Sequence, residues 1–400
     1  MRLASIRKDV SPDTPGFVRL TGVIERESGE TFAIWYEVPA ELEADLSESS
    51  NPWLVAMLPH ALPNGETIVS DLPADATLLE NLKGLIAVWC DWYPQYLPPV
   101  IRAPVASLTV DAPPNPKSAA FFSGGVDSWF TVLRHAPERE SAAIGRVEEL
   151  ISVHGFDIPL DAPDEFAELH ATLAKGAQAL GRKLIVVRTN LRRSGSLWVK
   201  GWGWLTNGAG LASVALILEK RYGKVLIGSS YPYGNLFPWG SHPMTDGLFS
   251  TRSLMVKQDG AAFNRTEKTA LVARHAIALA HLHVCWKNGA ASNCGICPKC
   301  IRTMATLQLL NAFEIANPFP VAFRQDRLAG LYIATRYEEA FIREIHALAA
   351  QTKHRPIQAA AAHALRRSRR IRPLIKVADG LGRVPVMWRL GPKIRKWCVS

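Results

Sequence analysis

Four short apolar segments, separated by stretches with helical periodicity, constrain the fold of this chain more than any other feature. The expected strands are Ala119–Phe122, Leu150–His154, Leu184–Arg188 and Lys224–Gly228, and the expected helices are Trp129–His135, Glu165–Leu180 and Gly210–Tyr222. Strands separated by helices of this length form right-handed βαβ units, in which the strands are parallel. Short runs of Val, Leu and Ile suit a sheet that is covered on both faces. The sequence therefore predicts an α/β fold built on a parallel sheet.

The chain on either side of this region has a different character. Strand-like stretches at Gly16–Ile24 and Thr31–Val38, a helix candidate at Thr77–Trp89 and a proline-rich segment precede it. The prolines exclude regular helix and favour a linker, so we place a boundary near Asn115. The expected organisation is an N-terminal α+β accessory domain (1–115), a central domain (116–313) and a basic, mostly helical C-terminal extension (314–400).

The positive charge of the chain is concentrated in that extension. The 400 residues carry a formal net charge of +10, and residues 314–400 hold 17 Lys and Arg against 6 Asp and Glu, a net of +11. A basic cluster can attract phosphates or anionic lipid, although many such clusters are simply solvated. Nucleic acid or a partner protein is therefore a candidate ligand of the extension or of the N-terminal domain. The arginines of the cluster are Arg366, Arg367, Arg369, Arg370 and Arg372.

Composition excludes several classes of protein. With 48% hydrophobic and 20% charged residues, the chain is not disordered, collagen-like or coiled-coil. No apolar run approaches the roughly 18 residues that cross a bilayer, and no secretory signal is visible at the start of the sequence. Six cysteines are too few for a disulfide scaffold. We therefore expect a cytoplasmic protein without a transmembrane segment.

A glycine-containing segment, Phe121–Ser128 (FFSGGVDS), is the most informative motif. A strand leads into a Ser-Gly-Gly turn, and a helix follows. Two glycines let backbone N–H groups converge on an anion, and the helix N-terminus adds partial positive charge. The hydroxyls of Ser123 and Ser128 could donate to phosphate oxygens, and Asp127 could bind Mg²⁺ or position the loop. The absence of a Gly-Lys-Ser/Thr ending excludes a Walker A loop, while a ligand-free turn stays open as an alternative.

The SGGVDS segment resembles the PP-loop of the N-type ATP pyrophosphatases, which cleave ATP to AMP and pyrophosphate. The resemblance implies a Rossmann-like, adenine-nucleotide alpha-hydrolase-like domain that binds ATP and Mg²⁺. It also implies that Ser123, Asp127 and Ser128 take part in catalysis. The loop residues that would hold the pyrophosphate are Phe122, Ser123, Gly124, Gly125, Val126, Asp127 and Ser128.

Four of the six cysteines lie within sixteen positions, in the spacing C-x8-C-x2-C-x2-C. Gaps of two residues let thiolates converge on one ion, and four thiolates form a closed tetrahedral site typical of structural Zn²⁺. An iron–sulfur cluster is the alternative. A zinc deaminase is excluded because the chain has no H-x-E segment and its cysteines are ordered Cys-Pro-x-Cys. The predicted zinc ligands are Cys285, Cys294, Cys297 and Cys300.

The segment CWKNGAASNCGICPKC, downstream of SGGVDS, resembles the zinc segment of the 7-cyano-7-deazaguanine synthases (QueC-like). The resemblance covers roughly Ala119–Leu310, half of the chain. In that family an Asn precedes a helix as Asn207 does here, and the fourth strand is followed by a loop, here IGSS with Gly228. The resemblance implies that Asn207 and Gly228, like His154 and Arg188, help to bind the nucleotide. Asp246 lies in the region that the family uses for substrate. The chain departs from the family in its N-terminal domain, its basic extension and the segment at 188–206.

Other side chains could line the same site. His154 and Arg188 each follow a strand's carboxyl end, where α/β folds bind ligands, although solvated loop residues also occur there. Lys257, Arg265 and Arg302 could neutralise negative charge on the substrate, or could be ordinary surface cations. Three tryptophans at 198, 202 and 204 could stack on a planar ring or anchor a packed loop.

Three functions follow from these motifs. In the first, the chain is a QueC-like, ATP-dependent ligase that adenylates a carboxylate and joins it to a nitrogen nucleophile as an amide or a nitrile. In the second, it is a PP-loop enzyme that modifies tRNA by thiolation, although only Cys90 and Cys398 lie outside the cysteine cluster. In the third, it is a zinc module that binds nucleic acid without catalysis.

Overall fold

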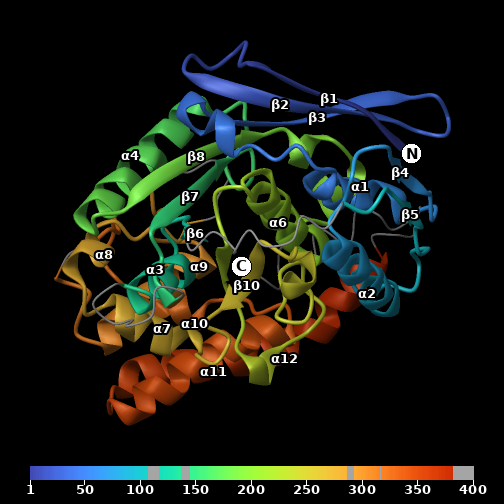
Figure 1. Cartoon of the computed structure of the whole chain (residues 1–400). Helices are drawn as coiled ribbons and strands as arrows, with labels where there is room; N and C mark the ends of the chain where they lie inside the picture. The colour runs from blue at the N-terminus through green and yellow to red at the C-terminus, as the bar shows by residue number, and fades with distance from the viewer. Residues whose placement is uncertain (107–116, 137–144, 286–291, 316, 382–400) are drawn as a thin grey trace. The chain divides into compact units, whose positions relative to one another are not determined.

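The structure is a computed structural model that describes residues 1–106, 117–136, 145–285, 292–315 and 317–381 (Figure 1). The chain forms two compact units. The first contains Met1–Phe263, and the second contains Asn264–Lys287 together with the residues from Ser292 onward. The expected boundary near Asn115 and the last residues of the extension lie outside the described residues.

A single mixed sheet organises the first unit. Among the described residues it has ten strands, in the order β10-β9-β6-β7-β8-β3-β2-β1-β4-β5. Their bounds along the chain are β1 (Arg2–Val10), β2 (Phe17–Glu25), β3 (Thr31–Pro39), β4 (Ile68–Ser70), β5 (Ile101–Arg102), β6 (Ser118–Phe121), β7 (Glu149–His154), β8 (Lys183–Thr189), β9 (Lys224–Gly228) and β10 (Met255–Asp259).

The centre of the sheet is parallel, as the sequence predicts. β6 pairs in parallel with both β7 and β9. On the outer sides, β7 pairs in parallel with β8, and β9 pairs in parallel with β10. Parallel strands have their carboxyl ends at one edge of the sheet, so the residues that follow β6, β7, β8, β9 and β10 share that edge. The α/β class is therefore confirmed, and β10 is a fifth parallel strand that the sequence analysis did not identify.

The N-terminal strands extend the same sheet. β2 lies between β1 and β3 and is antiparallel to both, and the three strands form the long blue ribbon of Figure 1. β3 then pairs with β8 through only two residue pairs, Tyr36 with Thr189 and Glu37 with Arg188. Residues 1–106 are thus joined to the parallel strands by backbone hydrogen bonds as well as by side-chain packing.

Helices cover both faces of the parallel strands. Ala119 and Phe121 of β6 belong to a large core with residues of α1, α2 and α6, whereas Ala120, also buried, does not. Alternate residues of a strand point to opposite faces, and α3 and α4 contact β9, β7 and β8. The helices of this unit are α1 (Asn51–Ala61), α2 (Ala76–Trp92), α3 (Val126–Arg134), α4 (Pro163–Ala179), α5 (Ser196–Lys200) and α6 (Asn207–Ile217), with short helical turns η1 (Ala40–Asp45), η3 (Leu191–Arg193), η4 (Trp202–Thr206), η5 (Tyr233–Asn235) and η6 (Asp246–Phe249).

The second unit is helical where it is described. Its helices are α7 (Arg265–Val272), α8 (Ala276–Ala280), α9 (Pro298–Leu309), α10 (Gln325–Ala329), α11 (Arg336–Gln351) and α12 (Arg355–Leu381). Apolar residues of α9, α10, α11 and α12 share one core, which includes Ile301, Leu328, Ile345 and Ile357. The expected helical character of the C-terminal extension is therefore confirmed as far as Leu381.

Candidate functional site

The SGGVDS segment forms the turn between β6 and α3. Gly124 has a φ of 75°, a left-handed conformation that glycine adopts without steric cost. Gly125 is the extended N-cap of α3, with φ −74° and ψ 166°. The first N–H groups of α3 have no partner within the helix itself, so the sequence builds a strand–turn–helix whose backbone donors can converge on an anion.

The side chains of this turn differ in exposure. Ser123 is exposed, Asp127 is half-buried in the first turn of α3, and Ser128 is buried. The Ser128 hydroxyl donates to the Gly125 carbonyl oxygen at 3.0 Å. In this conformation Ser128 therefore holds the turn closed, whereas Ser123 is accessible to a ligand.

Gly228, at the end of β9, lies against the same turn. A Cβ atom at this position would be 2.9 Å from the Asp127 carbonyl oxygen and 3.2 Å from the Asp127 Cβ. Real side chains essentially never make contacts shorter than 3.0 Å, and backbone atoms cannot move aside easily. Glycine at position 228 therefore lets β9 approach the start of α3 and sets the position of Asp127.

His154 and Arg188 are paired residues at the ends of β7 and β8. The Arg188 Nε donates to His154 Nδ1 at 3.4 Å, and the His154 Nε2 lies 3.0 Å from the Pro159 carbonyl oxygen. Because Nδ1 accepts from Arg188, Nε2 is the ring nitrogen that donates to the Pro159 carbonyl oxygen, and burial lowers the pKa of His154, which favours the neutral ring. The structure brings the two predicted residues together and gives each a protein partner.

The third member of this group, Glu37, was not identified from the sequence. It is fully buried in β3 and accepts hydrogen bonds from Arg188 Nη1 at 2.6 Å and Arg19 Nε at 2.8 Å. Ser11 donates to the same carboxylate. Glu37 and Arg188 are 151 positions apart, so no local pattern could reveal the pair.

Asp246 and Asn207 lie beside two glycines, Gly208 at the start of α6 and Gly240 in the loop between η5 and η6. Asp246 is fully buried and accepts hydrogen bonds from Ser241 Oγ at 2.6 Å and from the His242 N–H at 3.1 Å. Burial raises its pKa to about 7, against these hydrogen bonds. A Cβ at Gly208 would meet Asp246 Oδ1 at 2.7 Å, and one at Gly240 would meet Asn207 Oδ1 at 2.7 Å. The fold therefore brings these two predicted residues into one cluster.

Two buried acceptors in this region have no hydrogen-bond partner within the described chain. They are Asn207 Oδ1 and Gln258 Oε1, and the Gln258 Nε2 donates to Asp246 Oδ2 at 3.2 Å. A buried polar atom without a partner is uncommon and indicates a site for water or ligand. A cavity of about 10 Å³, the size of one water molecule, adjoins Gln258 and has aromatic walls formed by Tyr231, Phe237 and Trp239. These aromatic residues were not identified from the sequence.

The three tryptophans in the segment after β8 pack against the protein. Trp198 is fully buried, and its Nε1 donates to the Ala56 carbonyl oxygen at 3.1 Å, so it anchors a packed loop. Trp202 packs on Phe156, with ring centroids 4.6 Å apart. Trp204 packs on Tyr93 at 4.8 Å. The packed-anchor interpretation is therefore correct for Trp198.

The predicted cations lie in different places. Lys257 is exposed on β10, the strand at one edge of the sheet. Arg265 and Arg302 belong to the second unit, where both guanidinium groups lie over the ring of Phe341, at 5.3 Å and 4.5 Å. The structure therefore gives Arg265 and Arg302 a shared packing partner.

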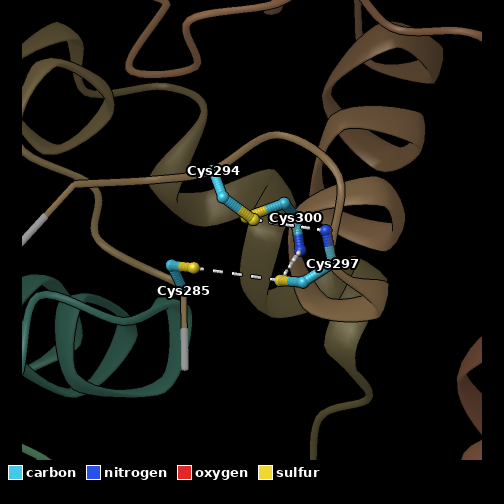
Figure 2. Close-up of side chains that lie close together, drawn as sticks. All are labelled: Cys285, Cys294, Cys297 and Cys300. Atoms are coloured by element: carbon cyan, nitrogen blue, oxygen red, sulfur yellow. Dashed lines mark hydrogen bonds between the residues drawn. The ribbon is translucent and has the colours of Figure 1, made fainter. Parts of the chain in front are cut away.

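The second unit contains a candidate metal centre. The Sγ atoms of Cys285, Cys294, Cys297 and Cys300 all lie within 4.8 Å of one another, and Figure 2 shows the four side chains converging. The Cys285–Cys297 and Cys294–Cys300 pairs are 4.0 Å and 3.9 Å apart. Thiolates bound tetrahedrally at about 2.3 Å from one zinc ion are about 3.8 Å apart. The four cysteines are therefore positioned to hold a metal ion, consistent with Zn²⁺.

Local backbone geometry positions these thiols. Gly295 has a φ of 67°, and the Cys297 N–H donates to Cys294 Sγ at 3.3 Å, which forms the turn between the two ligands. Asn293 Oδ1 accepts from the Cys285 N–H at 3.2 Å and so ties the first cysteine to the others. Hydrogen bonds from Cys300 lower the pKa of the Cys297 thiol, which favours the thiolate that a metal requires.

Comparisons of this chain with protein-family models, curated proteins and solved structures give no match. In the part of the chain that the structure describes, no helix is both long enough and apolar enough to cross a membrane.

Proposed function

We propose that this chain is an ATP-dependent carbon–nitrogen ligase of the PP-loop type, related to the 7-cyano-7-deazaguanine synthases. The observation that carries the proposal is the FFSGGVDS segment at a strand–turn–helix junction. Its left-handed Gly124 and the close approach of Gly228 to Asp127 support an anion site at the start of α3. The pyrophosphate part of ATP is the anion that the motif implies.

The proposed reaction has two steps. A substrate carboxylate oxygen attacks the α-phosphorus of ATP, so that the bond to the β-phosphate oxygen breaks and pyrophosphate leaves. A nitrogen nucleophile then attacks the resulting acyl adenylate and displaces AMP, which gives an amide. A nitrile would need a second ATP, because the amide oxygen must attack its α-phosphorus, release pyrophosphate and then leave as AMP. The protein contributes positioning and charge neutralisation, with Ser123 and the first N–H groups of α3 on the phosphates. Asp127 is the proposed ligand of Mg²⁺, which would offset the charge of the pyrophosphate.

The group around His154 and Arg188 and the group around Asp246 have separate proposed roles. His154 and Arg188 would line the nucleotide site, although both already have protein partners. Asn207, Asp246 and the unpartnered Gln258 Oε1 would lie near the acceptor substrate, since buried acceptors without partners favour a ligand that donates hydrogen bonds. Zn²⁺ at the four cysteines would be structural, because four thiolates leave no open position on the ion.

The cysteines disfavour the alternative function, thiolation of tRNA. A thiolase needs cysteines for sulfur transfer, and four of the six in this chain converge at the candidate metal centre. Of the other two, Cys90 is half-buried in α2, where burial raises its pKa and lowers its reactivity. Cys398 lies outside the described residues.

The test is ATP turnover by the purified protein, with AMP, ADP and pyrophosphate separated chromatographically. Candidate carboxylates such as carboxy-deazaguanine are added with and without ammonium. We expect AMP and pyrophosphate that depend on the carboxylate in the wild type, and loss of both in Asp127→Ala. Asp164→Ala, which changes an acid in the first turn of α4, is the matched control and should keep the activity. Formation of ADP and phosphate would contradict the proposed reaction.

A further inference from the structure

The last described helix, α12, has one buried face and one exposed face. Ile357, Ala361 and Ala364 are buried in the core that α12 shares with α10 and α11. Ser368, also buried, accepts from the Ile333 N–H at 3.0 Å. This side of the helix is therefore fixed to its own unit. The other side faces solvent along most of its length.

The arginines of α12 are not all used in ion pairs. The buried carboxylate of Glu339 on α11 binds Arg343, Arg369 and Arg372 at 2.6 to 3.0 Å, so three cations share one anion. Arg366 and Arg370 are exposed and have no carboxylate partner among the described residues. The surface formed by α11 and α12 therefore has an excess of positive charge that the unit itself does not neutralise.

Two exposed aliphatic side chains continue the same stripe. Leu374 is 49% exposed and Val377 is 60% exposed. Arg370 follows Arg366 by four residues, Leu374 follows Arg370 by four, and Val377 follows Leu374 by three. Residues three and four apart lie on one face of a helix. The exposed face of α12 is thus cationic in its middle and aliphatic toward its end, and we name these four residues the α12 stripe.

We infer that the α12 stripe docks on the surface of an anionic phospholipid bilayer. Basic residues near such a surface are attracted to its negative potential, and aliphatic residues on the same face enter the boundary between headgroups and acyl chains. A nucleic-acid backbone would engage the arginines, but it would gain nothing from Leu374 and Val377. The helix would lie on the membrane rather than cross it, and this binding does not depend on the proposed ATP chemistry.

The experiment is co-sedimentation of the full chain with lipid vesicles. One set is pure phosphatidylcholine, and in the other about one third of the lipid is phosphatidylglycerol. We expect binding to the anionic vesicles only. Arg366→Gln with Arg370→Gln should weaken the partition coefficient by about 30-fold, because each basic residue near the surface contributes about a factor of five. Leu374→Ser with Val377→Ser should weaken it by about tenfold.

Two controls make the result decisive. Arg274→Gln with Arg336→Gln neutralises two other exposed arginines of the same unit and should leave vesicle binding unchanged. Binding of single-stranded RNA by each variant is measured in parallel at the same salt concentration. Vesicle binding that survives the Leu374 and Val377 changes would overturn the inference. So would RNA binding by a protein that does not bind anionic vesicles.

Discussion

At the scale of single residues, the role of a residue in this fold depends more on which atoms lie close to it than on its chemical type. Gly228 could be predicted from the sequence because it lies at the end of a strand. Its importance comes from the structure, because a Cβ atom at this position would lie only 2.9 Å from the Asp127 carbonyl oxygen. Glu37 could not be named, because its partners Arg19 and Arg188 come from other strands. Residues within one motif were therefore predictable, and partners brought together by the sheet were not.

Replacement of Gly228 by alanine should disturb the SGGVDS turn. The added Cβ forces β9 away from the start of α3, so we expect the unfolding free energy to fall by about 1–3 kcal/mol and the affinity for ATP to fall with it. Chemical denaturation and calorimetric titration with ATP measure the two effects. Gly247→Ala is the control, because a Cβ at Gly247 meets no atom within 4 Å. If the two variants had equal unfolding free energies and equal ATP affinities, the close contact between Gly228 and Asp127 would not matter for either property.

The buried carboxyl of Asp246 should make stability depend on pH. Burial raises its pKa to about 7 from the ordinary 3.8. Between these values the folded state binds a proton that the unfolded state lacks. The stability that the protonated Asp246 contributes is therefore fully present below about pH 4 and is lost as the pH rises to about 7. Relative to Asp246→Asn, the wild type should lose up to about 4 kcal/mol over this range.

Unfolding free energies of both proteins at several pH values test this prediction. The difference between them isolates Asp246, since all other titrating groups are shared. A difference that stays constant from pH 4 to pH 8 would show that the folded-state pKa is not raised.

At the scale of elements, the sequence revealed β2 and β3 of the antiparallel region as well as four of the five parallel strands. β6, β7, β8 and β9 are short apolar runs and were predicted to within one residue at each end. β1 exposes most of its side chains, and β10 (MVKQD) alternates buried and exposed residues, so neither shows an apolar run. α1 was missed because Pro52 and Pro59 lie inside it and every residue is buried, which removes the helical periodicity.

The junction of β3 with β8 should depend on Glu37. Only two residue pairs join these strands, and the Glu37 carboxylate links Arg188 of β8 to Arg19 of β2. Glu37→Ala leaves two arginines without their buried anion, so we expect a loss of about 3–5 kcal/mol in stability. Thermal or chemical unfolding measures it. Glu41→Ala, which removes an exposed pair with Lys183, should cost less than about 1 kcal/mol.

The cysteine cluster should hold one zinc ion per chain, and zinc should stabilise the second unit. Elemental analysis of the purified protein gives the metal content. Cys297→Ser should lose most of the metal and lower the melting temperature, because it removes one of four ligands. Cys90→Ser changes a cysteine outside the cluster and should keep both properties. Iron with visible absorbance in place of zinc would instead establish an iron–sulfur cluster.

At the scale of the whole chain, the two most specific sequence motifs fall in different compact units. The SGGVDS turn belongs to Met1–Phe263, and the four cysteines belong to the second unit. Both could be predicted because each motif is encoded in fewer than twenty consecutive residues. The cluster around Asp246 could be predicted only in part, since its buried acceptors and the aromatic walls of the adjoining cavity come from α6, β10 and the segment between β9 and η6.

The central claim is that a carboxylate oxygen attacks the α-phosphorus of ATP. The most direct measurement uses a carboxylate substrate labelled with heavy oxygen and mass spectrometry of the nucleotide product. If the carboxylate is adenylated and nitrogen then displaces AMP, one labelled oxygen must appear in the phosphate of AMP. AMP that carries no label, or a label found in phosphate or pyrophosphate, would contradict the account.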